Sequence, residues 1–486
     1  MPPLTTRHHD PHTNRFLLLS IFVFASLLLY LTTHKPTPTT PSISSSPVKP
    51  SRVVSSSSST TNVQKPLVVS IGGEGGGGEI PIIQHRIVAI GDIHGDFLAL
   101  TRILRKASLI DLKGQWIGGR TVLIQTGDIV DRGVDTIVCY KFMQSLRSGA
   151  EKVGGKVVSL LGNHEIMNAL GDWRYVNKDD IKHFEITDSL TREFYIRSFG
   201  GERNRREAMS SGWIGQEWRS NYSITARVPY LVSQFPSQLS ADSQGLESED
   251  EKFLMDPAEE LSSSISSSSS SSKLELDGAI SFVHGGIIPE YLETLKDNHK
   301  PISEINRIGK SLMNLLERQP YPISLPRSST LEQKLFWSEL GPMWSRVWAL
   351  QDETTGLCDK VEKVLKKLKV RRLVMGHTPN FEGMVSRCRG KILLIDTGIS
   401  RAYGGSHSFL EISHTLRPHS SDDYDDDDEE EHSYNEVLGV EEEKEEEKKG
   451  RKWIEHELVK AVYEERESGL PKEEVLVDYK RVLRIR

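Results

Sequence analysis

The sequence is poor in cysteine, in aromatic residues and in apolar residues generally. It has 3 cysteines, 7% aromatic and 37% hydrophobic residues, whereas globular domains have about 45–50% apolar residues. Three cysteines exclude a small disulfide-stabilised scaffold, and 38 glycines are too few for a collagen-like repeat. A mean hydropathy of −0.40 excludes a protein with many membrane spans. The low apolar content of 486 residues predicts one folded core with polar segments attached.

The three cysteines also give no positive signal. Cys139, Cys358 and Cys388 form no Cys-x-x-Cys pair, and their number is odd. They therefore neither demand disulfides nor suggest a zinc knuckle, and the redox compartment of the protein stays open.

The net charge of −7 conceals an uneven distribution. The segment from Asp422 to Glu447 contains 16 acidic residues and one lysine, a net −15, which leaves +8 for the rest of the chain. Such a run is typical of an inert solvated segment. An electrostatic lid over an active site, a partner-binding tail and a metal-buffering loop are the alternatives.

An uncharged apolar run, Phe16–Leu31, follows two arginines near the N-terminus. With Thr32 and Thr33 it reaches 18 residues, and a bilayer span needs at least about 17. No Ala-x-Ala cleavage site precedes His34. We therefore expect a single-pass membrane protein of the endomembrane system. A secreted or lumenal protein, released after signal cleavage, is the alternative.

Composition divides the chain into segments. The tail and anchor occupy residues 1–33, and a Ser/Pro/Gly-rich stem predicted to be disordered follows at 34–84. Residues 85–414 are the predicted catalytic domain, interrupted at about 236–275 by a serine-rich insertion predicted to be disordered. The acidic segment takes 415–450, and residues 451–486, of mixed apolar sequence, are expected to pack on the core.

Short β-branched runs indicate the strands of a buried sheet. Helical patterns at 97–107 and 135–146 separate the first three runs. This alternation predicts βαβ units in an α/β core, in which ligands gather at the carboxyl ends of the strands. The predicted strands are 87–90, 121–124, 156–161, 279–283, 371–375 and 392–395.

Clusters of glycine and polar residues follow five of these runs. The first and second clusters are separated by 31 residues, and the second and third by 28. Each interval fits one helix plus one strand. A lone Asp or His in a loop is usually a cap, but five clusters in order at strand ends are not explained that way. In chain order they are GDIHG (91–95), GDIVDRG (127–133), GNHE (162–165), VHGG (283–286) and MGHTP (375–379).

The side chains in these clusters offer oxygens and imidazoles but no thiolate. Such a set suits divalent Mn, Fe or Zn and disfavours a cysteine-type structural zinc site. Six ligands are too many for one open catalytic metal and suit two ions, which at about 3.5–4 Å apart activate a water and bind a phosphoryl group. The predicted ligands are Asp92 and His94 for one ion, Asn163, His284 and His377 for the other, and Asp128 as the bridge.

These residues resemble the phosphoprotein phosphatase branch of the calcineurin-like metallophosphoesterases. GDIHG, GDIVDRG and GNHE match its three signature blocks, VHGG matches a further one, and the resemblance spans about residues 85–410. Leu161 stands where the eukaryotic enzymes usually carry arginine, and GHTP (376–379) and DTG (396–398) replace two of their other motifs. The departures point to the Shewanella-like, bacterial-type protein phosphatases. They argue against eukaryotic-type regulatory subunits and against sensitivity to the natural toxins that bind that region.

The resemblance implies an α/β calcineurin-like metallophosphoesterase fold, with a helix-flanked sheet core and a two-metal site at the strand carboxyl ends. It implies the same six ligands and two divalent ions, with Mn²⁺ preferred. His164 is then similar to the general acid of the family, with Asp131 orienting its imidazole. Arg132 looks like a phosphate clamp, and Arg346 is the candidate for a second one.

The predicted activity is hydrolysis of a phosphomonoester by metal-bound hydroxide, in a protein phosphatase acting on phosphoSer/Thr or phosphoTyr. No Cys-x5-Arg motif suggests a covalent phosphoenzyme. A dinucleoside polyphosphate hydrolase or other nucleotide phosphohydrolase shares GDxHG and is the alternative. A membrane-tethered pseudophosphatase is a remote one, because no predicted ligand is missing. The predicted partners are a phosphoprotein substrate and the membrane, and no nucleic acid.

Overall fold

The computed structural model describes residues 68–69, 82–185, 201–230, 278–297, 299–419, 451–464 and 472–485. The apolar run at 16–31, the serine-rich stretch at about 236–275 and the acidic run lie outside these residues. The membrane anchor therefore stays a prediction. Within the described part of the chain, no helix is both long and apolar enough to cross a bilayer.

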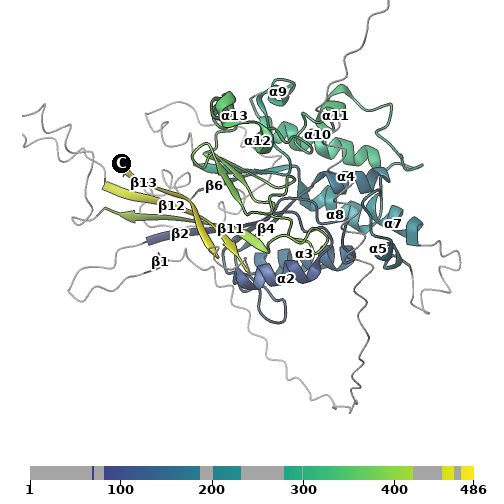
Figure 1. Cartoon of the computed structure of the whole chain (residues 1–486), viewed down its shortest axis with the longest axis horizontal. Coiled ribbons are helices and arrows are strands. Elements are labelled where there is room, and N and C mark those ends of the chain that lie inside the picture. Colours follow the sequence, from purple (N-terminus) through teal and green to yellow (C-terminus); the bar gives the residue numbers. More distant parts are fainter. Residues whose placement is uncertain are drawn as a thin grey trace, which may run out of the picture. The chain divides into compact units, whose positions relative to one another are not determined.

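Two β-sheets form the core of the described chain (Figure 1). The first has the order β13-β12-β11-β2-β3-β4-β5, with β1 beside β2. Its strands from β2 to β5 are parallel, whereas β11, β12 and β13 are antiparallel to their neighbours. They are β1 (Val68–Val69), β2 (Ile82–Ile90), β3 (Val122–Gln125), β4 (Lys156–Leu160), β5 (Tyr222–Ser223), β11 (Ser408–Pro418), β12 (Arg451–Tyr463) and β13 (Glu473–Ile485).

The second sheet has the order β6-β7-β8-β10-β9. Its three central strands are parallel, and an antiparallel strand lies at each edge. The sequence predicted three of its strands but not that they belong to a separate sheet. They are β6 (Thr225–Pro229), β7 (Ala279–Val283), β8 (Arg372–Met375), β9 (Val385–Arg387) and β10 (Ile392–Leu394).

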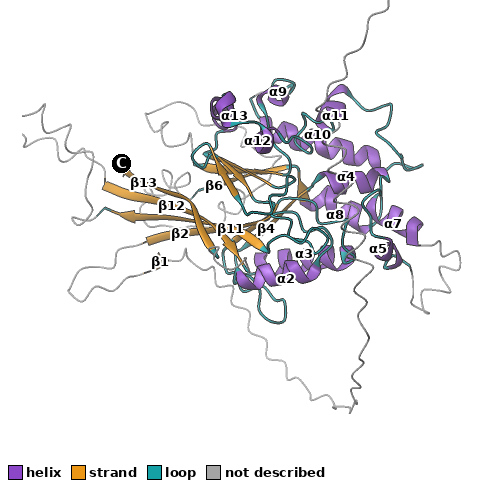
Figure 2. Cartoon of the chain, viewed as in Figure 1, coloured by secondary structure: helices purple, strands orange, loops and turns teal. Residues whose placement is uncertain are grey.

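Helices flank the two sheets (Figure 2). Helix α2 begins where the Asp96 carboxylate accepts the Ala99 N–H at 3.0 Å, which satisfies one free donor of the first turn. Its buried residues include Leu100, Ile103 and Leu104, which form one helical face. The helices are α2 (Phe97–Lys106), α3 (Thr136–Glu151), α4 (Asn163–Leu170), α5 (Lys178–Lys182), α7 (Gly201–Met209), α8 (Trp213–Asn221), α9 (Pro289–Leu292), α10 (Pro301–Leu316), α11 (Leu331–Phe336), α12 (Val347–Leu350) and α13 (Leu357–Leu368), with a short 3₁₀ turn, η2 (Glu353–Thr355).

The apolar runs of the central strands are uninterrupted because both faces of each strand are covered. In β2, Ile87 and Ala89 belong to the apolar layer between the two sheets, while Val88 and Ile90 belong to the core formed with the helices. All four are 0% exposed. This double burial is why the sequence shows no polar alternation there.

Each of the six predicted strands is present, and both predicted helices are found, although the second continues to Glu151. The first sheet is larger than the sequence indicated. It begins before residue 85, because Val68–Val69 pairs with β2, and β11 continues past residue 414 to Pro418. Composition averaged over a segment does not reveal these pairings, because their partners lie far away in the sequence.

Two glutamates of β12 tie this C-terminal strand to the second sheet. Glu455 and Glu457 are both 0% exposed. Glu457 accepts hydrogen bonds from Arg372 Nε at 2.8 Å and Nη2 at 2.6 Å, and Glu455 accepts from Arg371 Nη2 at 3.0 Å. Burial opposes the charge of Glu455, but His414, Arg371 and Arg481 hold its pKa at about 2.

A disulfide joins Cys358, in the first turn of α13, to Cys388, just after β9. Nothing in the sequence indicated this pair, because the two cysteines are 30 residues apart and a third cysteine is present. The structure leaves Cys139 as the buried free thiol. The pairing follows from the fold, which brings the two α-carbons within 5.3 Å.

We predict that Glu455→Gln lowers the free energy of unfolding at pH 7 by about 3 kcal/mol. The folded-state pKa of Glu455, about 2, lies below its ordinary value of 4.5. The stabilisation of the folded state by the ionised Glu455 is therefore present above pH 4.5 and is lost as the pH falls from 4.5 towards 2. Urea unfolding at several pH values measures it. Glu473→Gln removes an exposed pair with Lys460 in the same hairpin and is the control. Equal stability of Glu455→Gln and wild type at pH 7 would contradict the prediction.

Candidate metal centre and active site

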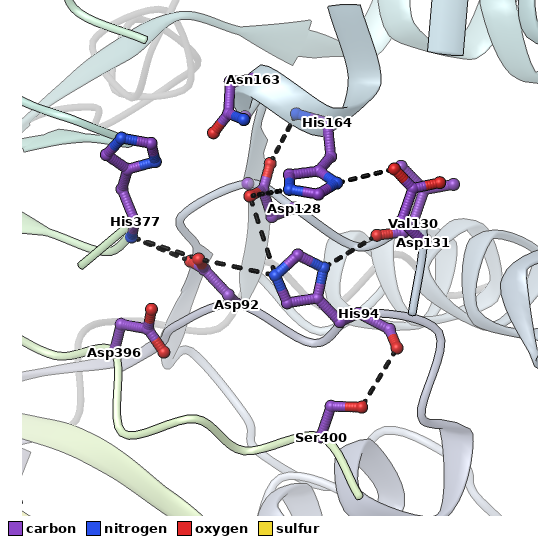
Figure 3. Close-up of polar contacts among 12 residues, drawn as sticks. Asp92, His94, Asp128, Val130, Asp131, Asn163, His164, His377, Asp396 and Ser400 are labelled. Atoms are coloured by element: carbon purple, nitrogen blue, oxygen red, sulfur yellow. Dashed lines mark hydrogen bonds and ion pairs between the residues drawn. The ribbon is translucent and has the colours of Figure 1, made fainter. Parts of the chain in front are cut away.

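The six predicted metal ligands lie together at the carboxyl ends of parallel strands from both sheets, and Figure 3 labels all of them except His284. Three loops of the first sheet and two of the second supply them. All six side chains are buried, with at most 4% of their surface exposed. The ligands are Asp92 and His94 after β2, Asp128 after β3, Asn163 after β4, His284 after β7 and His377 after β8.

Three of the histidines have one ring nitrogen bonded to a backbone carbonyl. A carbonyl oxygen only accepts, so that nitrogen carries the proton and the other one keeps a free lone pair. This orientation is typical of histidines that ligate metals. The contacts are His94 Nδ1 to Val130 O at 3.0 Å, His284 Nδ1 to Thr126 O at 2.9 Å and His377 Nε2 to Trp344 O at 3.2 Å.

Asp128 lies at the centre of the group. Its Oδ2 is 3.3 Å from His284 Nε2 and 3.9 Å from His94 Nε2, while its Oδ1 accepts the His164 N–H at 2.9 Å. Asn163 Oδ1 lies 2.8 Å from the same His284 nitrogen. A carboxylate between the two sets of histidines is placed as a ligand shared by two ions would be.

Two overlapping triplets, His94–Asp128–His164 and Asp128–His284–His377, have ligand atoms that all lie within 4.8 Å of one another. Such a set of oxygens and imidazoles in a buried position fits divalent cations. These buried side chains could therefore hold divalent metal ions.

A further buried carboxylate, Asp396, lies beside Asp92 (Figure 3) and was not among the predicted ligands. Burial and the neighbouring carboxylates raise the pKa of Asp92 well above its ordinary value, and burial raises the pKa of Asp396 to about 6. Burial and the neighbouring His164 lower the pKa of His94 to about 4. The site thus concentrates carboxylates beside a neutral imidazole, which favours cations. The only sequence signal for Asp396 was its place in DTG.

Close backbone approach explains the glycines of the motifs. A β-carbon at Gly162 would lie 2.0 Å from Asp128 Oδ1, and one at Gly376 would lie 2.4 Å from Asp92 Oδ1. Five site residues other than glycine adopt a positive φ, an uncommon conformation that clusters at functional sites. They are His94, Asp128, Asp131, Arg132 and His377, with φ between 47° and 75°.

Glu165, the last residue of GNHE, joins the loops after β3 and β4. Its Oε1 accepts from Ile129 N at 2.9 Å and Tyr140 Oη at 2.8 Å. Its Oε2 accepts from Asp128 N at 2.9 Å and Gly162 N at 2.7 Å. The motif contained this glutamate, but nothing in the sequence showed that it organises both loops.

His164 differs from the three histidines predicted to be metal ligands because a carboxylate orients it. Its Nδ1 lies 2.6 Å from Asp131 Oδ2, and its Nε2 lies 3.8 Å from Asp128 Oδ2. Burial opposes protonation, but Asp128 and Asp131 raise the pKa of His164 above its ordinary value. An imidazole held in this way is suited to donate a proton.

The two predicted phosphate clamps have different surroundings. The Arg132 guanidinium lies 4.2 Å from the ring centre of Tyr175 and 5.1 Å from that of Tyr403, and no ion pair of Arg132 is found in the described chain. Arg346 Nη1 donates to His377 O at 2.8 Å and Thr378 Oγ1 at 3.0 Å. Arg346 therefore holds the loop of a ligand, and its role as a second clamp stays a prediction.

The chain is similar to several known proteins. The calcineurin-like phosphoesterase family model matches residues 85–381. An uncharacterised protein of Schizosaccharomyces pombe is 34% identical over 330 residues, which cover 67% of this chain and 77% of the relative. Shewanella-like protein phosphatase 2 of Arabidopsis thaliana is 27% identical over 320 residues, or 65% of this chain and 72% of the relative.

Solved structures of a cold-active protein tyrosine phosphatase also match. One is 22% identical, with a TM-score of 0.46, and covers 69% of this chain and 76% of its own. The predicted fold class and the predicted phosphoester hydrolase activity are confirmed by the family match and the named relatives. The chain belongs to the calcineurin-like phosphoesterase family and is a metallophosphoesterase related to the Shewanella-like protein phosphatases.

Proposed function

We propose that this metallophosphoesterase removes phosphate from phosphorylated side chains of proteins, with His164 as the general acid. The observation that carries the proposal is the short contact between His164 Nδ1 and Asp131 Oδ2, 2.6 Å, beside the six clustered ligands. The name of its Arabidopsis relative supports a protein substrate. A site of this kind can bind a phosphate dianion and protonate the oxygen that leaves it.

Two divalent ions fit the six ligands, with Asp128 shared between them. When bound, such ions supply positive charge to the phosphoryl oxygens and lower the pKa of a water nucleophile. The remaining tasks fall to side chains that are not ligands. They are to bind the phosphate, to hold the proton donor and to deliver the proton.

Arg132 is suited to binding the phosphate. Its guanidinium lies over the rings of Tyr175 and Tyr403 and not beside a carboxylate of the described chain, so no carboxylate there competes with phosphoryl oxygens for it. Tyr403 also lies 5.3 Å, centre to centre, from the His94 ring. The two tyrosines therefore keep Arg132 next to the metal ligands.

His164 is suited to the departure of the leaving group. As the bond between phosphorus and the leaving oxygen breaks, that oxygen takes the proton from His164 Nε2 and leaves as an alcohol or phenol. Asp131 Oδ2 accepts the Nδ1 hydrogen throughout and keeps the ring in one orientation. A second proton from water restores the imidazolium after product release.

We predict that the purified chain, supplied with Mn²⁺, hydrolyses phosphoSer, phosphoThr or phosphoTyr peptides. Release of inorganic phosphate measures the reaction. Diadenosine tetraphosphate, tested in parallel, is expected to be a poor substrate. Hydrolysis of the dinucleotide alone would overturn the proposal in favour of a nucleotide phosphohydrolase.

We predict that His164→Asn reduces kcat on an alkyl phosphate such as a phosphoserine peptide by about 10²–10⁴-fold. The loss on p-nitrophenyl phosphate is expected to be much smaller, because its phenolate leaves without help from a proton donor. Steady-state kinetics on both substrates measures the difference. His299→Asn, at an exposed histidine, is the control. Full activity of His164→Asn on the alkyl phosphate would refute the role of His164.

Metal removal gives a further prediction. Dialysis against a chelator is expected to abolish activity, and Mn²⁺ is expected to restore it.

Asp128→Asn should weaken metal binding by at least the 10–100-fold typical of outer-shell changes, because Asp128 serves both ions. Titration calorimetry of the metal-free protein measures the affinity. Asp359→Asn, at an exposed position of α13, is the control, and an unchanged affinity of Asp128→Asn would exclude the bridge.

A further inference from the structure

A completely buried arginine lies behind the Asp131–His164 pair. Arg205 belongs to α7 (Gly201–Met209), and its side chain is 0% exposed, as are Asp131 and Asp180. Because of this burial, Arg205 does not contact solvent or substrate. A guanidinium in such a position is costly unless it is paired and hydrogen-bonded.

Arg205 connects two carboxylates and an amide. Its Nη1 donates to Asp180, and its Nη2 donates to Asn168 Oδ1 at 2.9 Å and lies 3.4 Å from Asp131 Oδ1. Asn168 Nδ2 donates to the same oxygen of Asp131 at 2.8 Å. One oxygen of Asp131 thus faces Arg205 and Asn168, and the other faces His164.

The far end of this network is anchored in the fold. Asp180, in α5, accepts from Thr136 N at 3.2 Å and Thr136 Oγ1 at 2.9 Å at the start of α3. The rings of Phe184 and Trp173 lie 5.0 Å and 5.9 Å from the guanidinium carbon. Arg205 therefore has a fixed position, set by elements that do not belong to the metal site.

We propose that Arg205 is a positioning residue for the general acid, an inference that rests on the proposed function of His164. The terminal torsion of an aspartate is soft, so a carboxylate with one oxygen free could turn away from the imidazole. Arg205 and Asn168 together restrain Oδ1 of Asp131. Oδ2 is therefore kept on His164 Nδ1, and Nε2 stays directed towards Asp128 and the cluster of predicted metal ligands (Figure 3).

The hydrogen-bond inventory of Arg205 supports a role beyond stability. Its Nε has no hydrogen-bond partner in the described chain. Buried ion pairs are often no more stabilising than apolar residues of the same volume, and an orphan buried N–H adds to their cost. An energetically costly arginine that restrains Asp131, which in turn orients His164, is expected where the general acid has to be placed precisely.

The test removes the guanidinium together with the charge that it neutralises. We predict that Arg205→Met/Asp180→Asn loses about 10–100-fold in kcat on a phosphoserine peptide, a fraction of the full general-acid effect. The same variant should stay within about 3-fold of wild type on p-nitrophenyl phosphate. KM is expected to change little on either substrate, because Arg205 does not contact substrate.

Arg205→Lys is the second variant, for use if the double variant unfolds, because it keeps the buried positive charge. An ammonium cannot reach Asp180, Asn168 and Asp131 as a planar fork does, so the selective loss on the alkyl substrate should persist in weaker form. The matched control is Arg147→Met/Glu217→Gln, which removes an arginine–glutamate pair of α3 and α8 outside the network. Its losses, if any, should be equal on both substrates.

Combining these changes with His164→Asn separates positioning from structural support. Once the acid is absent, removing Arg205 should cost nothing further on the phosphoserine peptide. The inference would be overturned if Arg205→Met/Asp180→Asn lost equal activity on both substrates, or if it lost as much activity in the His164→Asn background as in the wild type. Either result would leave the proposed function standing. If His164→Asn itself showed no dependence on the leaving group, the general-acid proposal and this inference would fall together.

Discussion

The site depends on one buried carboxylate that accepts hydrogen bonds from two loops at once. Glu165 receives backbone N–H groups from the loop after β3 and from the loop after β4, and the hydroxyl of Tyr140 completes its shell. Without these bonds the N–H groups of Asp128 and Gly162 would be unpaired in a dry interior, at a cost of about 1–3 kcal/mol each. Glu165 thereby fixes the distance between the central ligand Asp128 and the helix that carries Asn163 and His164.

The four histidines of the site fall into two groups, according to whether a backbone carbonyl or a carboxylate contacts one nitrogen of the ring. In three of them one ring nitrogen contacts a backbone carbonyl, which leaves the other ring nitrogen for a cation. His164 leans on Asp131, whose negative charge favours a protonated ring. The same type of side chain is therefore suited to bind a metal or to donate a proton according to the group that contacts its ring. Since those partners come from other loops, the distinction cannot be made from the histidine's own sequence neighbours.

The sequence predicted what is local and missed what is brought together from a distance. The central strands and the ligand clusters were predictable, because double burial produces continuous apolar runs and each cluster follows its strand directly. The division into two sheets, the Cys358–Cys388 bond and the supporting roles of Asp396 and Arg205 were not. Each of these depends on partners far away in the chain, and neither periodicity nor spacing records such pairings. Tyr403 likewise reaches Arg132 only through the fold.

The position of β11 and β12 has a consequence for how the enzyme is made. The strand that carries Asp92 and His94 at its end, β2, pairs with β11, so that Ala89 lies opposite Leu410. In turn β11 pairs with β12, whose glutamates accept hydrogen bonds from Arg371 and Arg372 at the start of β8, the strand that leads to His377. During synthesis, the segment that forms β2 leaves the ribosome long before its partner strand β11 does. The sheet that carries the first motif is thus closed by a contact between segments far apart in the chain, and contacts of that kind are the slow ones to form in folding.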